Sequence, residues 1–576
     1  MPVQNTNLSE KTPLIYPADS PGGSLPVHDE NDQDAFDASN ALLADGVVSK
    51  TVDLDSLPDV TENWTFINRL FYIAYFPFSI WFIMVNEALE RFSFYGLRVL
   101  LPNYLANTPQ FHLDQDKALS IISIFSSAAY ITPILGSFLA DMLIGKYWTI
   151  TLLSLIYCLG GVVTAVTAIP SILDKVGIAG IILGLALIAL GTGGIKSSVS
   201  SFAADQFAPR KGDRVSKMSL LTSFFTIFYL SVNIGSTASV IITPIVRNYF
   251  SYWAAFMIPA VLLFVGTLVF AVGKFNYQHV KPGGFILWKA FRCFVSAIIN
   301  LNSEQYKNLS KWNFLGHAEH VYGPEFIDDL RAALRVIMYL PPILFFFSLS
   351  DLSSAIWIYQ ANLMNRSFFG SKQLSSDQLA FLNPVIIIIM APTLDRVVYP
   401  IVNKFIRVTP LRKMYVGFVF TALAMTMSGI LEIFVELHPQ RVHVLFQIPQ
   451  YFIMCLGELL IAISSMDFAY QEAPTSMKSM MQATFLAYIS FGDLNNLLMI
   501  NIMSPIPIFQ AEKTQFADAY RMFVFAFEMC LGLVYFFLTT FRYKYKKERD
   551  AEKKEALKDA IMEADASKSI QAVEVE

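Results

Sequence analysis

Residues 81–100 read WFIMVNEALERFSFYGLRVL, an apolar segment with Glu87, Glu90 and Arg91 near its middle. Its length and composition predict a membrane-spanning helix, and helical spacing places Glu87 beside both Glu90 and Arg91. Each charge at the centre of such a helix costs roughly 2.5–3.5 kcal/mol on the insertion scale. The cluster therefore predicts a helix face that borders protein or a wet cavity, and it indicates a functional site.

The whole chain of 576 residues is 54% hydrophobic and only 15% charged, which is too apolar for a soluble globular protein. Apolar segments of about 20 residues recur along it, and we expect about twelve membrane-spanning helices. They are predicted near 74–103, 118–141, 148–169, 177–203, 219–245, 252–272, 333–360, 378–401, 413–436, 443–467, 481–503 and 519–541. The predicted fold class is an all-α membrane protein.

These spans fall into two groups of six, the usual layout of a secondary transporter whose two bundles rock about a central site. Bases cluster after spans four, six and twelve, which places both termini in the cytosol by the positive-inside rule. A soluble regulatory domain in the central linker is the alternative. The predicted parts are a disordered acidic cytosolic tail at 1–70, an N-terminal bundle at 71–272, a cytosolic linker at 273–332, a C-terminal bundle at 333–543 and a charged cytosolic tail at 544–576.

Further polar residues are expected at membrane depth in both bundles. These residues are Arg98, Lys196, Asn233, Arg335, Asp351, Asn383, Glu458, Asp493 and Glu528. The bases lie mainly in the first half and Glu458 in the second, a polarity that suits a zwitterion. The alternative is that the charges only pair with one another and hold the bundles together, although buried ion pairs add little net stability.

Arg335 and Asp395 are expected at similar depth on the cytosolic side, where they would close an inner gate or form a static pair. Asp351 is grouped with them as a gating residue, near the outer half of span seven, and the sequence identifies no base as its partner. For Asp493 and Glu528, structural and proton-carrying roles both stay open.

Four ordered motifs resemble those of the proton-coupled oligopeptide transporters, within the major facilitator superfamily. They are NEALERFSFYG at 86–96, GTGGIKSSVSSFAADQF at 191–207, FTIFYLSVNIGS at 225–236, and YFIMCLGE at 451–458 with APTSMKSMMQA at 473–483. The small residues before Lys196 also predict close backbone packing. The resemblance covers about 74–545 and implies the major facilitator fold.

The resemblance implies proton-driven uptake of di- and tripeptides by alternating access, with the proton co-transported and no cofactor or metal. Glu87, Glu90 and Arg91 match the motif that couples proton to substrate. The implied substrate-binding residues are Arg91, Arg98 and Lys196 for the peptide carboxylate, Asn233, Asn383 and Glu458 for the backbone and amino terminus, and Tyr95 and Tyr130 for the pocket wall. Ser123 stands where animal members carry a histidine, so coupling through that histidine is excluded here.

One coupling scheme follows from these residues. A proton on Glu87 or Glu90 loosens the hold on Arg91, which then captures the peptide carboxylate. Glu458, without a partner, takes the peptide ammonium.

Two other functions remain as alternatives: proton-coupled transport of another small anion such as nitrate or a carboxylate, and a peptide-sensing receptor or scaffold. An enzyme is not expected, since no nucleophile–base or metal-ligand set lies at depth, and no nucleic-acid partner is expected. Glu10, Leu14 and Ile15 have the spacing of an adaptor-read sorting signal, or match it by chance. Small peptides, protons and membrane lipid are the other expected partners, in the plasma membrane or an endolysosomal or vacuolar membrane.

Overall fold

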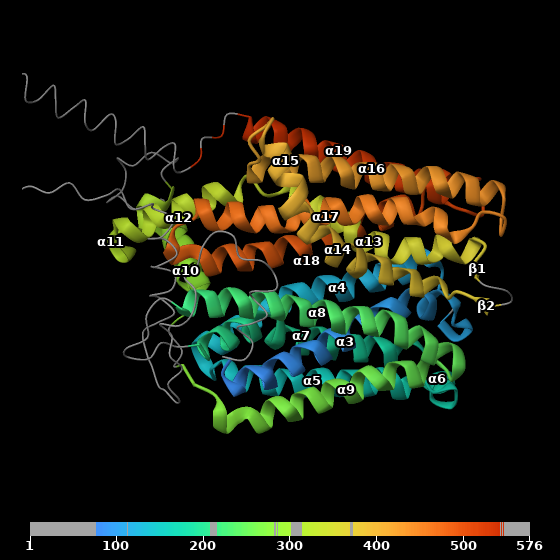
Figure 1. The fold of residues 1–576 in the computed structure, drawn as a ribbon, viewed down its shortest axis with the longest axis horizontal. Coiled ribbons are helices and arrows are strands. Elements are labelled where there is room, and N and C mark those ends of the chain that lie inside the picture. The colour runs from blue at the N-terminus through green and yellow to red at the C-terminus, as the bar shows by residue number, and fades with distance from the viewer. Residues whose placement is uncertain are drawn as a thin grey trace, which may run out of the picture.

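The computed structural model describes residues 76–111, 113–207, 216–280, 284, 286–300, 314–368, 372–541, 543 and 545. These residues are nearly all helical, and one short antiparallel pair, β1 (Ser367–Phe368) with β2 (Lys372–Gln373), joins two helices (Figure 1). The predicted tails, with the sorting string at Glu10, Leu14 and Ile15, lie outside this part of the chain.

The helices form a first group, a linker group and a second group along the chain. The first group is α3 (Phe78–Asn107), α4 (Gln115–Phe138), α5 (Lys146–Thr167), α7 (Ile178–Asp205), α8 (Ser216–Tyr249) and α9 (Tyr252–Val272), with the short α6 (Pro170–Val176). The linker group is α10 (Ile286–Asn300), α11 (Glu319–Tyr322) and α12 (Pro324–Ile337). The second group is α13 (Pro342–Leu363), α14 (Leu382–Thr393), α15 (Tyr399–Asn403), α16 (Pro410–Leu437), α17 (Ile448–Glu472), α18 (Lys478–Met503) and α19 (Ala517–Thr540).

Eleven helical segments in the described chain are long and apolar enough to cross a membrane. The expected twelfth, α3, has the length for it at 30 residues but carries Glu87, Glu90, Arg91 and Arg98. It packs inside the first group against α8 and α9, so its charged face is covered by protein. The predicted all-α membrane fold is confirmed.

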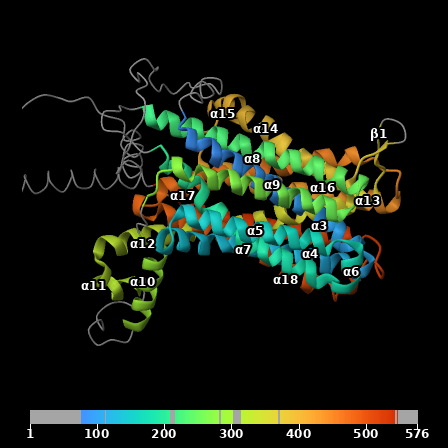
Figure 2. The same ribbon diagram turned by 90° about the horizontal axis from the view of Figure 1, so that it is seen from below.

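The two groups form two halves that lie side by side (Figure 1). In the first half α5 packs against α7 and α9, and in the second α16 packs against α17 and α19. The halves meet mainly where α4 packs against α18, with further contacts of α3 with α13 and of α8 with α14. The linker helices lie beyond one end of the bundle and β1 lies at the opposite end (Figure 2); we name these the linker end and the hairpin end.

The predicted close approach at Gly191–Lys196 is confirmed. A Cβ added at Gly193 would lie 2.7 Å from the backbone of Thr132 on α4, and one at Gly191 would lie 2.5 Å from the backbone nitrogen of Tyr157 on α5. Because only glycine fits there, α7 packs tightly against both neighbours and holds Lys196 at a fixed depth.

Span seven begins later than predicted. The prediction started it at 333, whereas α12 ends at Ile337 and α13 begins at Pro342, after Pro341. The apolar stripe of the amphipathic α12 runs into the apolar α13, which makes the two look like one span. Arg335 therefore lies exposed on a linker helix, and its predicted place at membrane depth is wrong.

Candidate functional site

A central cavity lies between the two halves and holds about 1400 Å³ of empty space. It contains six of the predicted substrate-binding residues: Tyr95, Arg98, Tyr130, Asn233, Asn383 and Glu458. The first four come from α3, α4 and α8, and the last two from α14 and α17. Both halves thus contribute to one site, and the roles of these residues stay predictions.

The coupling cluster forms one contiguous group on α3. Nε of Arg91 donates to Oε1 of Glu87 at 2.7 Å and lies 3.2 Å from Oε2 of Glu90. Glu87 and Glu90 are buried. The prediction that these three charges share one helix face is confirmed, and the guanidinium of Arg91 forms ion pairs with both carboxylates.

Lys196 does not line the cavity but lies behind one of its wall residues, Tyr130. Its Nζ is 3.9 Å from the ring centroids of both Phe94 and Tyr130, a cation–π arrangement. Within the described chain this ammonium is buried and has no hydrogen-bond acceptor. Tyr130 separates it from the cavity, since that ring lines the cavity on one side and contacts Lys196 on the other.

Arg98 and Asp351 form an ion pair that the sequence did not identify. Nη2 of Arg98 also lies 3.4 Å from Oγ of Ser354, on the same helix as Asp351. The pair connects α3 of the first half with α13 of the second, next to the cavity. Arg98 is therefore engaged by a carboxylate of the protein in this conformation.

The acidic side of the cavity also differs from its sequence description. Nδ2 of Asn383 donates to Oε2 of Glu458 at 2.9 Å, so Glu458 has a partner, contrary to the expectation. The amide of Asn383 orients this carboxylate, and that of Asn233 donates to the backbone oxygen of Tyr229 in its own helix at 2.8 Å.

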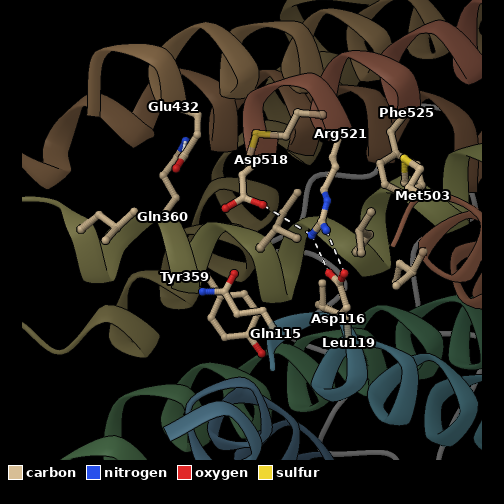
Figure 3. Close-up of a pocket in the computed structure, with 15 residues that line it drawn as sticks. Gln115, Asp116, Leu119, Tyr359, Gln360, Glu432, Met503, Asp518, Arg521 and Phe525 are labelled. Atoms are coloured by element: carbon tan, nitrogen blue, oxygen red, sulfur yellow. Dashed lines mark hydrogen bonds and ion pairs between the residues drawn. The ribbon is translucent and has the colours of Figure 1, made fainter. Parts of the chain in front are cut away.

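The hairpin end is closed by contacts between the halves. Arg521 of α19 donates two hydrogen bonds to Asp116 of α4, from Nη1 to Oδ1 at 2.5 Å and from Nη2 to Oδ2 at 2.8 Å (Figure 3). Arg247 of α8 pairs with Asp377 of the 3₁₀ helix Ser376–Phe381 at 2.6 Å. Because charged, two-pronged hydrogen bonds are among the strong ones, these contacts hold this end shut.

An acidic group borders the same closed end, and two of its members, Glu432 and Asp518, line a second, smaller pocket (Figure 3). Carboxylate oxygens of Glu432, Glu436 and Asp518 lie within 4.8 Å of one another, and Gln360 donates to Glu432 at 2.7 Å. Neither this group nor the closing pairs could be identified from the sequence, because charged residues near the ends of membrane spans are usually solvated.

The predicted inner gate is not formed in this conformation. Arg335 of α12 and Asp395 of the π-helical segment Leu394–Val398 are both exposed, and no ion pair joins them in the described part of the chain. Arg335 belongs to the linker group and Asp395 to the second half, and their gating role stays a prediction.

Comparison with known proteins gives one consistent family. The model of the POT family matches residues 147–516. Solute carrier family 15 member 2 of Danio rerio is 38% identical over 368 residues, covering 62% of this chain and 50% of that protein. Solute carrier family 15 member 1 of Homo sapiens is 34% identical over 450 residues, covering 75% and 61%. The chain thus spans about half to three fifths of the length of these animal relatives.

A fungal relative matches over more of its length. Peptide transporter PTR_A of Candidozyma auris is 29% identical over 534 residues, covering 83% of this chain and 87% of that protein. Among solved structures, an auto-inhibited POT family peptide transporter superposes with a TM-score of 0.68 at 28% identity, covering 81% of this chain and 98% of that one. The POT family transporter PepTSo gives 0.68 at 30% identity with the same coverage.

Proposed function

Because this chain belongs to the POT family, we propose that it is a proton-coupled symporter of di- and tripeptides that works by alternating access. Relatives and structural neighbours named as peptide transporters support the substrate class. The geometry of the central cavity supports the way in which such a substrate is held.

The observation that carries the proposal is the opposition of charges across the cavity. Arg98 lies on the first half and Glu458 on the second, and both line the same space of about 1400 Å³. A peptide zwitterion places its carboxylate toward Arg98 and its ammonium toward Glu458, and so it contacts both halves at once. The empty space between these two ends leaves room for varied side chains.

Peptide binding is then an exchange of partners. Asp351 holds Arg98 before the substrate arrives, and the peptide carboxylate takes its place. Glu458 keeps the hydrogen bond from Asn383 while it accepts the ammonium. Because the Arg98–Asp351 pair joins the halves, its opening by substrate links occupancy of the cavity to movement of the halves.

Proton coupling acts at Arg91, two turns from Arg98 on the same helix. Arg91 is shared between Glu87 and Glu90, and a proton on either carboxylate removes one of its two partners. The released guanidinium then turns toward the peptide carboxylate. Release of the proton into a less acidic compartment restores the cluster and expels the substrate.

A small anion is a weaker candidate substrate, because Asp351 and Glu458 repel it from the same cavity. A peptide receptor is separated from a transporter by measuring movement rather than binding.

The test uses the purified full-length protein in liposomes with an imposed inward proton gradient. Labelled dialanine should accumulate, unlabelled di- and tripeptides should compete, and nitrate and free amino acids should not. Dialanine binding without uptake would favour the receptor, and competition by nitrate alone would favour the anion transporter.

A further inference from the structure

Asp493 of α18 is a buried acid that the proposed site does not use. It has no solvent exposure, and neither carboxylate oxygen has a hydrogen-bond partner among the described residues. An ionised carboxylate in such a place needs a donor or a base beside it. Asp493 is therefore either protonated or placed to meet a base that moves.

The neighbouring polar residues of α18 are all engaged. Asn495 donates to Glu528 at 2.7 Å, and Asn496 donates to the backbone oxygen of Ser348 at 2.8 Å. Glu528, which the sequence could not distinguish from Asp493, thus has an amide partner. Of these two acids, only Asp493 is left without one within the described chain.

Asp493 lies at the seam between the halves. Ser490, one turn earlier on the same face of α18, bonds Ser127 of α4 with 2.8 Å between their hydroxyl oxygens. A second bond, from Oγ of Ser490 to the backbone oxygen of Ser127, measures 3.0 Å. This part of α18 is fixed against the first half, and Asp493 faces it.

The bases that act electrostatically on Asp493 are Arg98 and Lys196, both from the first half. Arg98 already has Asp351 as its partner, whereas Nζ of Lys196 is buried without an acceptor in the described structure. Tyr130 of α4 also interacts electrostatically with Asp493. On the other helices that pack around α18, Glu458 of α17 accepts a hydrogen bond from Asn383. The bases Lys289 and Arg292 of α10 and Arg335 of α12 are exposed.

We propose that Asp493 is a second proton-binding carboxyl group of the transport cycle, carried by the second half, and that Lys196 pairs with it when it is ionised. The proposal rests on the proposed function and extends it. A proton on Asp493 removes the attraction between Asp493 on α18 and Lys196 on α7. Loss of that proton returns Lys196 to Asp493 and ties the halves together across the seam.

Infrared difference spectroscopy of the purified protein tests this without any transport. As the pH is raised from acid, the carbonyl stretch of protonated carboxylic acids should decrease in the wild type, and Asp493→Asn should lose one component of that change. Glu528→Gln is the matched control, since it removes a nearby acid that already has an amide partner, and it should keep the Asp493 component. A spectrum of Asp493→Asn identical to that of the wild type would overturn the proposal.

Lys196→Gln tests the base while Asp493 stays in place. It should move the loss of the same component to higher pH, because the ionised carboxylate has lost its partner. An unchanged titration would overturn the assignment of Lys196.

Transport then separates the two proposals. In liposomes, Asp493→Asn should keep dialanine counterflow and lose part of the acid stimulation of uptake. If the wild type moves no peptide, the proposed function fails, while the infrared result still reports on Asp493. If the wild type accumulates peptide and Asp493→Asn shows the same pH profile, the role of Asp493 in the cycle fails.

Discussion

Arg98 on α3 forms an ion pair with Asp351 on α13, so a base of one half is held by an acid of the other at the edge of the central cavity. The same guanidinium is the one that the peptide carboxylate needs. Binding of substrate and release of one contact between the halves are thus the same event at this position.

Asp351→Asn should raise the affinity for dialanine and slow its turnover. Arg98 becomes available to the peptide, but the contact that the substrate normally replaces is lost. We expect a Kd several-fold lower, about 1 kcal/mol, by calorimetry, together with slower counterflow. Ser354→Ala is the control and should change neither, since it removes the 3.4 Å contact to Arg98 and a hydrogen bond to the backbone oxygen of Asp351 but keeps the ion pair. A wild-type Kd with wild-type turnover would contradict the exchange of partners.

Breaking the Arg521–Asp116 pair should open the hairpin end more often. The two-pronged contact holds α19 to α4, and Arg521→Gln removes the charge from it. In a Cys530→Ser background, Ser350→Cys reports access to the cavity wall by a membrane-impermeant thiol reagent added at the hairpin end.

Labelling in the Arg521→Gln variant should be at least about fivefold faster, the lower end of typical coupling between sites. The swapped pair Asp116→Arg with Arg521→Asp should restore slow labelling. Equal rates in all three proteins would mean that this pair does not hold the end closed.

Asn383→Ala should weaken the preference for a free amino terminus. The amide orients Glu458, so its removal leaves the carboxylate without its donor at 2.9 Å. The ratio of dialanine to N-acetyl-dialanine affinity should fall, and it should fall further in Glu458→Gln. Ser353→Ala, on the wall of the same cavity, should leave the ratio unchanged. An unaltered ratio in both of the first two variants would remove Glu458 from ammonium recognition.

Gly193→Ala should destabilise the first half by about 1–3 kcal/mol, because overpacking forces α7 away from α4. The added Cβ would lie 2.7 Å from the backbone of Thr132, which cannot move as a flexible side chain does. Thermal unfolding in detergent should show a lower midpoint than for Leu183→Ala, on the exposed side of the same helix. An equal unfolding midpoint for the two variants would show that α7 can move away from α4 without loss of stability.

The parts of this molecule that a local pattern encodes were predictable. The Glu87–Glu90–Arg91 face follows from helical spacing, and the packing at Gly193 follows from small residues near Lys196. Where a local pattern continues across a break, as from α12 into α13, the prediction of span seven began too early.

The partners of the charges could not be predicted in the same way. Asp351 meets Arg98, and Asp116 meets Arg521, across the seam between halves that are far apart in sequence. Glu528 differs from Asp493 only because one faces an amide and the other does not. The partners of these charges depend on how the two halves pack, and the periodicity of residues along the chain does not encode that packing.

The central claim is that protons held at Glu87 and Glu90 drive peptide accumulation. The most direct measurement compares dialanine uptake by wild type and Glu87→Gln in liposomes, with an imposed proton gradient and in counterflow. The variant should retain counterflow exchange and lose accumulation above equilibrium, because Arg91 has lost its 2.7 Å partner and the cluster its proton exchange. Concentrative uptake by Glu87→Gln at the wild-type level would contradict the account.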